Sequence, residues 1–396
     1  MKIKLEFRSK ELKKIIDILN KNKANPRIIG GAVRDNLISL SVSDIDIATI
    51  LEPEEVIKIF ELEGYKAIPT GIDHGTVTII AAPEQFEITT LRKDIAPDGR
   101  RSIVEFTNNY EIDAERRDFT INALSYDLAE EKLYDYFGGL EDLKNNIVRF
   151  IGEPDQRIKE DYLRILRFFR FSARFSNKFD QESLGASIRN LDGLSKISIE
   201  RIYCELKLLF KLEKDLSCIF KIFSQAKIFR HFLPQFDIDY DGILNFEAKI
   251  NDILEIKPDL VMLRFSILVF TLGRREFEGF FKAMKFSSKE TRIALIIYDF
   301  ISALIDLQKI PEIYFTICKF WYYNPLLYKE FLSLALILGK IQKDDLKENL
   351  ELMQNPAPKM PVSANDLQAL GYSGLKLGVR IKFLEAEWIK SGFKIS

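Results

Sequence analysis

Two residue types are scarce in this chain of 396 residues, and their scarcity limits the metal chemistry open to it. The two histidines, His74 and His231, are too few for a multi-histidine metal site, which excludes an HD-type phosphohydrolase domain. The three cysteines, Cys204, Cys218 and Cys318, are scattered and form no Cys-x-x-Cys pair. We therefore expect buried apolar thiols in a reducing compartment, and neither a disulfide nor a zinc site.

Long uncharged hydrophobic runs are also lacking. The apolar stretch at residues 254–272 is interrupted by Glu255, Lys257, Asp259 and Arg264, so it is typical of a buried helix and not of a membrane span. The first residues contain no hydrophobic segment of the signal-peptide kind. We expect a cytoplasmic protein with no membrane association.

A strong net charge is the third missing feature, because 58 Lys and Arg face 59 Asp and Glu, for a formal net charge of -1. This balance does not suggest a nucleic-acid binder, although a whole-chain sum conceals local basic stripes. Apolar residues make up 47% of the chain, which supports a sizeable core. The length exceeds what one core usually serves, so we expect two to four subdomains.

The most informative feature present is a glycine pair followed by two carboxylates. Gly30 and Gly31 open a predicted helix, where a backbone without side chains can approach an anion that the helix N-terminus favours. Asp44 and Asp46 then alternate along a predicted strand at residues 44–50, so both point to one side of it. Together they predict a pocket for a phosphate chain and for metal ions.

The carboxylates favour magnesium as the metal. Two carboxylates this close are costly unless a cation neutralises them, and Mg²⁺ prefers carboxylate and phosphate oxygens. Two such ions can activate a hydroxyl and hold a pyrophosphate leaving group. Glu87, between core-facing Phe86 and Ile88, is a third candidate on a neighbouring strand. The alternative for Asp44 and Asp46 is that they form the polar outer face of a strand. The alternative for Glu87 is that it faces solvent.

The hydrophobic pattern predicts a mixed N-terminal part and a helical remainder. We expect helices at residues 10–22, 34–39 and 53–63 and strands at 26–29, 44–50, 76–82, 86–91, 124–127 and 133–136. The polar segment 92–109, which contains Pro97, predicts a mobile loop. From about Gly152 onward helical periodicity dominates and glycine becomes rare.

These motifs resemble those of the class II tRNA nucleotidyltransferases, the CCA-adding enzymes and their bacterial poly(A) polymerase relatives, in a bacterial form without an HD domain. The matching segments follow the family's order at residues 30–35 with 44–46, 74–78 with 87–90, 116–123, 135–142, 160–167 and 198–205. The resemblance implies an α+β fold, with a nucleotidyltransferase head of mixed β-sheet and flanking helices. It places the head at 1–150, and an all-helical neck, body and tail at 151–215, 216–350 and 351–396.

The resemblance also assigns roles to residues. It implies catalytic roles for Asp44, Asp46 and Glu87, with Asp44 and Asp46 as metal ligands. The residues it implies for nucleotide binding are Gly30, Gly31, Arg34, Asp35, Arg117, Asp118, Asn122, Glu160, Asp161, Arg164 and Arg167. A guanidinium such as that of Arg117 suits phosphate, and Asp118 would accept from a ribose hydroxyl, with Asn122 seating the sugar. The alternative for Arg117 and its neighbour is a surface basic pair.

Asp161 and Arg164 are the residues that we expect to select the base of the incoming nucleotide. They are three residues apart in a predicted helix and so would share a face. Cytosine and adenine both present an amino donor beside a ring-nitrogen acceptor, which an aspartate and an arginine complement, whereas uracil and guanine present the reverse. Glu160 would orient Arg164, and Arg167 would support the pair or the base. The alternative is a simple helix salt bridge.

The polar loop and the C-terminus carry two further expectations. In CCA-adding relatives a flexible loop after the sheet is needed for the final A, and this chain keeps a full one. Its polar members are Arg92, Asp94, Asp98, Arg100 and Arg101. Near the C-terminus, Lys376, Arg380 and Lys382 would grip the tRNA backbone. A helical tail docked by Trp388 and Leu384 is the alternative, and it does not exclude the first.

The sequence thus predicts a template-independent, Mg²⁺-dependent enzyme that adds C, C and A to the tRNA 3′ end. Its substrates would be CTP, ATP and the acceptor stem of tRNA, with pyrophosphate released. A poly(A) polymerase, or an enzyme adding only CC or only A, is the rival within the family. A non-catalytic tRNA-binding protein is the rival from another class. We expect a monomer or a weak homodimer.

Overall fold

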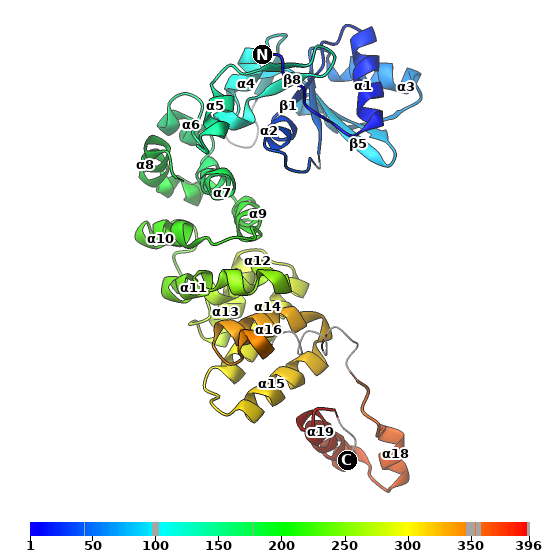
Figure 1. Ribbon diagram of the computed structural model, residues 1–396, viewed down its shortest axis with the longest axis vertical. Coiled ribbons are helices and arrows are strands. Elements are labelled where there is room, and N and C mark those ends of the chain that lie inside the picture. The colour runs from blue at the N-terminus through cyan, green and yellow to red at the C-terminus, as the bar shows by residue number, and fades with distance from the viewer. Residues whose placement is uncertain (43, 97–102, 177, 346–352, 354–357, 394–396) are drawn as a thin grey trace. The chain divides into compact units, whose positions relative to one another are not determined.

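The chain forms two compact units, Met1–Glu205 and Leu206–Ser396 (Figure 1). The computed structural model describes residues 1–42, 44–96, 103–176, 178–345, 353 and 358–393. The first unit combines β-sheet with helices, and the described part of the second is helical. Within the described residues, no helix has both the length and the apolar character needed to cross a bilayer.

The first unit contains a mixed seven-stranded sheet in the order β3-β4-β5-β2-β1-β8-β9 and a separate two-stranded sheet of β6 and β7. Its strands are β1 (Arg27–Ile29), β2 (Asp46–Thr49), β3 (Lys66–Gly71), β4 (Thr76–Ala81), β5 (Glu84–Thr90), β6 (Arg92–Ala96), β7 (Ile103–Phe106), β8 (Ser125–Asp127) and β9 (Lys132–Tyr134). Its helices are α1 (Lys10–Lys21), α2 (Gly31–Leu37), α3 (Pro53–Leu62), α4 (Tyr110–Glu115), α5 (Gly139–Lys144), α6 (Pro154–Glu160), α7 (Arg164–Phe175), α8 (Gln181–Arg189) and the first part of α9 (Ile199–Phe210). This confirms the predicted α+β class.

The sheet separates two apolar clusters because side chains alternate along its strands. In β1, Ile28 belongs to the main core, whereas Ile29 packs in a smaller cluster. In β2, Ile47 and Ala48 divide in the same way. Asp46 shares the face of Ala48, so its carboxylate lies opposite the main core.

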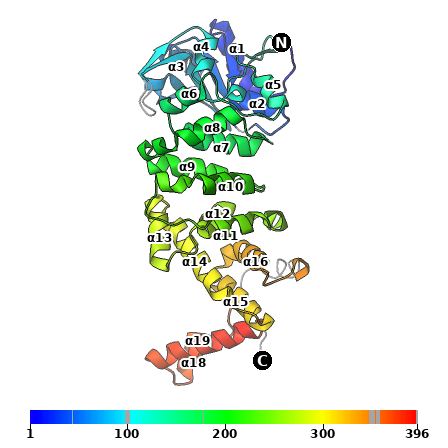
Figure 2. The ribbon, with the colours of Figure 1, turned by 90° about the vertical axis from the view of Figure 1, so that its left-hand side faces the viewer.

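Helices α6, α7 and α8 pack against one another at the end of the first unit (Figure 2). A group of phenylalanine rings joins them to the head. Phe119, which follows α4, lies 4.9 Å from Phe150 and 5.3 Å from Phe171 of α7, measured between ring centroids. Buried aromatic rings of this size contribute strongly to packing, so these rings pack α7 against the head.

Several expected elements differ from those observed. The strand expected at 44–50 begins at Asp46, which leaves Asp44 just outside it. Strand β3, whose sequence contains Pro69, was not predicted. Much of the expected loop 92–109 is the paired strands β6 and β7. Arg117 and Asp118 lie in a bend of the chain before a short 3₁₀ helix, Thr120–Asn122.

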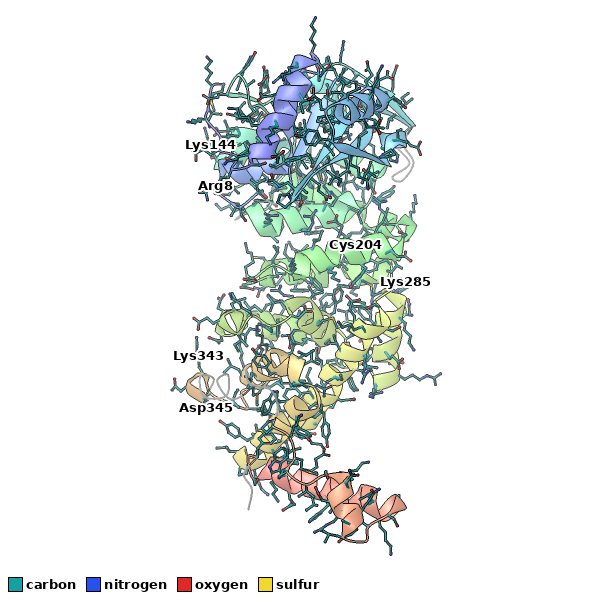
Figure 3. All side chains as sticks on the ribbon, turned by 90° about the vertical axis from the view of Figure 1, so that its right-hand side faces the viewer. Arg8, Lys144, Cys204, Lys285, Lys343 and Asp345 are labelled. Atoms are coloured by element: carbon teal, nitrogen blue, oxygen red, sulfur yellow. The ribbon has the colours of Figure 1, made fainter. Side chains whose placement is uncertain are left out.

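The expectation that the thiols are buried is wrong for two of the three cysteines. Cys204 and Cys218 are exposed, while Cys318 is half-buried, and all three are free. Figure 3 marks Cys204 on α9, where the core side is formed by Ile202, Leu206 and Leu209. Helical spacing puts position 204 on the opposite side of that helix. Burial raises the pKa of Cys318 to about 11.

The second unit is built around a buried ion pair. Its helices are the end of α9, then α10 (Ser217–Gln225), α11 (Tyr240–Glu247), α12 (Leu260–Leu268), α13 (Arg274–Ala283), α14 (Ser288–Leu304), α15 (Ile310–Tyr323), α16 (Tyr328–Ile337), α18 (Ala364–Ala369) and α19 (Gly374–Lys390). The side chains of Arg264 and Glu247 are both 0% exposed and are joined at 2.7 Å. Arg264 also donates to the carbonyls of Phe210, Leu212 and Lys214, so it closes the end of α9.

The last helix docks on α15 through aromatic rings. Trp388 of α19 is buried and lies 5.8 Å from Tyr322 and 5.2 Å from Phe393, measured between ring centroids. Glu385 accepts a hydrogen bond from the hydroxyl of Tyr323 at 2.6 Å. The tail docking through Trp388 that the sequence suggested is therefore observed. The predicted grip of this helix on tRNA stays a prediction.

The stability of the second unit should depend more on the buried Arg264–Glu247 pair than on any exposed ion pair. We expect Arg264→Met to lower the free energy of unfolding by about 3–5 kcal/mol, because it removes the opposite charge from the buried Glu247 carboxylate, which keeps the backbone N–H of Leu216, and removes the arginine donors from three carbonyls. Urea denaturation followed by circular dichroism measures this change. The matched control is Arg274→Met, since Arg274 pairs with Asp299 at the surface, where a loss below about 1 kcal/mol is expected. Equal losses in the two variants would contradict the central role of Arg264.

Candidate active site

The carboxylates Asp46 and Glu87 meet across neighbouring strands. β2 and β5 run parallel, and Asp46 is directly opposite Glu87 in their register. Burial raises the pKa of Asp46, and the nearby charges of Glu87 and Asp44 raise it further, against a lowering effect of Arg117. A cation placed here would relieve this crowding.

The donors fit a magnesium ion that also binds substrate phosphates. All three candidates offer carboxylate oxygens, and Mg²⁺ commonly takes one or two carboxylates and completes its shell with water and phosphate. Asp44 and Glu87 are exposed, whereas Asp46 is half-buried. Within the described residues no group of three or more histidine, cysteine, aspartate or glutamate side chains is close enough to hold a metal. A three-carboxylate site is thus not assembled, and Asp44 and Asp46 remain the predicted ligands.

The glycine pair lies beside these carboxylates. Ile29 of β1 is opposite Asp46 in the antiparallel register, and Gly30 follows it at once. Gly30 has φ of 65°, and a Cβ there would lie 3.0 Å from Nη1 of Arg117. A side chain at this position would therefore be strained and would crowd the guanidinium. Gly31 begins α2, as predicted.

Arg117 is held by an aspartate that the sequence interpretation missed. Asp113 of α4 accepts from Nη2 of Arg117 at 3.2 Å and from Nε of Arg116 at 2.9 Å. Burial alone would raise the pKa of Asp113, but Arg116 and Arg117 outweigh burial and lower it. Its position three and four residues before the arginine pair in a helix was the available signal. Arg116 and Arg117 are thus an anchored pair and not a loose surface pair.

Asp118 and Asn122 form a buried polar group next to Arg117. One carboxylate oxygen of Asp118 accepts from the amide of Asn122 at 2.9 Å, and the other accepts from Nε of Arg167 at 2.7 Å. Burial by itself would raise the pKa of Asp118, but Arg167 and these hydrogen bonds lower it. Asp118 is therefore ionised and oriented. Arg167 also reaches Glu205 at 3.3 Å.

Arg34 and Asp35 bind each other. Nε of Arg34 donates to Asp35 at 2.7 Å, and its Nη1 donates to the side chain of Asn122. Burial lowers the pKa of Arg34, partly offset by Asp35. Arg34 is 5% exposed, so its guanidinium is largely occupied by protein partners.

Asp161 and Arg164 do not share a helix, which corrects the predicted geometry. α6 ends at Glu160 and α7 begins at Arg164, with Asp161 in extended backbone between them. Asp161 accepts from Arg201 at 2.7 Å, whereas Arg164 pairs with Glu160 at 2.7 Å. The expected Glu160 contact is confirmed, and the simple salt bridge between Asp161 and Arg164 is replaced by two other pairs.

Backbone carbonyls fix the arginines of this turn. Arg164 donates to the carbonyl of Arg157 at 2.8 Å and to that of Arg116 at 3.2 Å. Arg157, which was not predicted, donates to the carbonyls of Arg116 and Arg117 at 2.7 Å each. The start of the neck is therefore bound to the loop that carries Arg117. Arg157 and Glu160 line a cavity of about 410 Å³ together with Asp94 of β6.

The predicted flexible loop is only partly described. Arg92 begins β6, its backbone N–H donates to Asp113 at 3.2 Å, and its guanidinium donates to the carbonyl of His74. Burial and the nearby charge of Arg116 lower the pKa of Arg92 to about 10. Asp94 lies on the same strand. Asp98, Arg100 and Arg101 lie outside the described residues.

Comparisons with known proteins agree with this site. Residues 26–149, within the first unit, match the poly(A) polymerase head domain, which makes this part of the chain a head domain of that class. The mitochondrial CCA tRNA nucleotidyltransferase 1 of Danio rerio is 34% identical over 395 residues, covering 96% of this chain and 87% of its own. The chain therefore belongs to the family of CCA-adding tRNA nucleotidyltransferases. Membership implies dependence on a divalent metal ion.

Solved structures show the same fold. The Bacillus stearothermophilus CCA-adding enzyme in complex with CTP has a TM-score of 0.73 at 23% identity and covers 96% of this chain and 92% of that one. The Thermotoga maritima CCA-adding enzyme complexed with tRNA has a TM-score of 0.71 at 18% identity, covering 98% and 92%. These likenesses extend over both units of the chain and support a head with a helical body and tail.

The opposite pKa shifts of Asp46 and Asp118 predict opposite effects on stability. The folded-state pKa of Asp46 is raised above its ordinary 3.8, so ionisation opposes folding as pH rises above 3.8. We expect Asp46→Asn to melt above the wild type at pH 7, with the gap closing below pH 3.8. Adding Mg²⁺ should raise the melting temperature of the wild type more than that of the variant.

Asp118→Asn is the control with the opposite sign. The folded-state pKa of Asp118 lies below 3.8, so its charge stabilises the fold above 3.8 and this stability is lost as pH falls through the lowered value. The variant should therefore melt below the wild type at pH 7. Shifts of the same sign in both variants would contradict the assignment of Asp46 as the crowded carboxylate.

Proposed function

We propose that this chain adds C, C and A to the 3′ end of tRNA from CTP and ATP, with release of pyrophosphate. The observation that carries the proposal is 34% identity over 96% of the chain to a CCA tRNA nucleotidyltransferase. Asp46 and Glu87, which are paired across β2 and β5 beside the Gly30 turn, supply a candidate reaction centre for this activity. We also propose that the enzyme acts in the cytoplasm as a monomer or weak homodimer.

The reaction would take place at the Asp46 end of β2. The 3′-oxygen of tRNA forms a bond to the α-phosphorus, and the bond from that phosphorus to the bridging oxygen of the β-phosphate breaks. Asp44 and Asp46 would hold Mg²⁺, with Glu87 beside them, and the bound ion supplies positive charge that favours the ionised hydroxyl and the leaving pyrophosphate. Burial and repulsion from Glu87 and Asp44 disfavour the ionised form of Asp46, so a bound cation would stabilise its carboxylate.

The nucleotide's charged parts would be held on the other side of Gly30. Because Gly30 has a positive φ and no side chain, the space beside the guanidinium of Arg117 would be open to a triphosphate. Asp118 would accept from the ribose 2′-hydroxyl, since its orientation is fixed by Asn122 and Arg167. A deoxynucleotide would leave that acceptor unpaired, which costs about 1–3 kcal/mol.

The base would be read by Asp161 and Arg164. Arg201 fixes the acceptor of Asp161, while Glu160 and the carbonyl of Arg157 fix the donors of Arg164. Two residues held independently can present an acceptor beside a donor, which complements cytosine and adenine. Uracil and guanine would place like groups together, and each mismatch costs about 1–3 kcal/mol.

Incorporation from separate nucleotides tests the proposal. We expect purified protein to add C from CTP to tRNA that ends before the CCA, and to add A from ATP only after both C residues are present. Gel analysis of labelled tRNA measures each step. Addition of many A residues to the unextended tRNA would favour a poly(A) polymerase. This alternative is tested because residues 26–149 match the poly(A) polymerase head domain. Addition that stops after CC, or addition of A alone to tRNA ending in CC, would favour the partial enzymes.

A single variant separates an enzyme from a tRNA-binding protein. We expect Asp46→Ala to reduce incorporation by at least 10³-fold while changing tRNA affinity less than twofold, because its carboxylate serves the reaction and not the RNA. Filter binding measures the affinity. Nucleotide incorporation by this variant at the wild-type rate would contradict the proposed role of Asp46 in binding the metal ion. Absence of incorporation by the wild type, with tRNA binding intact, would favour the non-catalytic alternative.

Base selection should weaken when Asp161 loses its charge. Asp161→Asn can donate as well as accept, so we expect the ratio of kcat/KM for CTP over UTP to fall by about tenfold or more. The matched control is Asp155→Asn, which changes an aspartate that pairs with Arg189 at the neck surface. Its ratio should stay within about twofold of the wild type. An unchanged ratio in Asp161→Asn would contradict the reading role.

A further inference from the structure

The last turn of α7 meets the helix that follows the glycine pair. The guanidinium of Arg34, in α2, lies 4.2 Å from the ring centroid of Phe175 and 5.3 Å from that of Phe171, both in α7. A cation over an aromatic face is attracted to it, more strongly where water is excluded. Arg34 is thus in contact with the neck helix and not only with its own motif.

Asp35 connects the same two helices by charge. One of its carboxylate oxygens accepts from Nε and Nη2 of Arg34 at 2.7 and 2.6 Å. Its other oxygen accepts from Nη2 of Arg174, in the last turn of α7, at 3.0 Å. Both oxygens of Asp35 are therefore engaged by arginines from two helices, an arrangement that fixes one helix relative to the other.

The polar chain continues from Arg34 to the middle of α7. Arg34 donates to Asn122, which donates to Asp118, which accepts from Arg167. Arg167 and Arg174 are seven residues apart and so lie on the same face of α7. The head therefore binds this helix near its middle and again at its last turn, about 10 Å further along its axis for a rise of about 1.5 Å per residue, in addition to the contact between Arg164 and the carbonyl of Arg116 at its start.

We propose that Asp35 and Arg174 are positioning residues that set the tilt of α7, and through it the place of Arg164, relative to the catalytic carboxylates. This inference rests on the proposed function. α7 begins at Arg164 and ends one residue after Arg174, so a shift of its last turn is carried along the rigid helix to its first turn, where Arg164 contacts Glu160 and the carbonyl of Arg116. A correct base would then no longer bring its α-phosphate to the reaction centre, and a displacement of about 1 Å can cost up to about 10²-fold in rate.

Arg174→Ala and Asp35→Asn test the inference through the nucleotide ratio. We expect kcat/KM for CTP to fall about tenfold or more in each variant, while kcat/KM for UTP, which the reading pair does not hold, changes less than twofold. A loss of folded protein would lower both values equally, so the ratio isolates positioning. Arg174→Lys keeps the charge and should recover at least part of the ratio. Because Asp35 is the carboxylate that Arg174 binds, adding Arg174→Ala to Asp35→Asn should change CTP use less than twofold further.

Arg189→Ala is the matched control. Arg189 pairs with Asp155 between α8 and α6, away from α2, and its CTP to UTP ratio should equal that of the wild type. Equal losses with CTP and UTP, or independent effects of the two substitutions in the double variant, would overturn the inference and make Asp35 a direct nucleotide or metal contact. An unchanged ratio in Arg174→Ala would also overturn it. A wild type that incorporates neither nucleotide would instead refute the proposed function.

Discussion

A carboxylate removed from water must be met by donors or by a cation, and this constraint organises both units of the chain. In the first unit, Asp113 and Asp118 are buried and held by arginines, and their pKa values are lowered. In the second unit, Glu247 is held by Arg264. Asp46 departs from this pattern, because its pKa is raised and its nearest strand neighbour is another carboxylate. The fold tolerates that cost at the place where a substrate-bound cation would remove it.

The same constraint explains how two distant parts of one site are kept in register. The residues proposed for the chemistry lie on short strands and a glycine turn, where the backbone itself sets the geometry. Those proposed to read the base lie more than a hundred residues later in the chain, between α6 and the start of α7. Asp118 lies between them, since it would touch the sugar and already binds Arg167 of α7. The residue proposed to contact the ribose is thus also part of the connection between the head and α7.

Local patterns in the sequence predicted what local forces determine. The spacing of Leu12, Ile15 and Leu19 predicted α1, and the alternation around Glu87 predicted β5 with its apolar side inward. The glycine pair and Asp46 also lie where the sequence placed them. The break between α6 and α7 could not be predicted, because residues 160–167 read as a continuous helix. Asp161 leaves the helix and pairs with Arg201, a contact 40 residues away that no local pattern reveals.

The arginines of the neck also resolve an apparent conflict between the chain's charge and its polyanionic substrates. A sum of -1 gives little general attraction for RNA or for nucleotides. The neck arginines do not supply a free positive surface either, because each is paired with a carboxylate: Arg157, Arg164, Arg167, Arg170, Arg174, Arg189 and Arg201. A paired guanidinium attracts distant phosphates weakly, but it is fixed in direction. Arginines held in this way are suited to reading and positioning one nucleotide, which is what selection without a template requires.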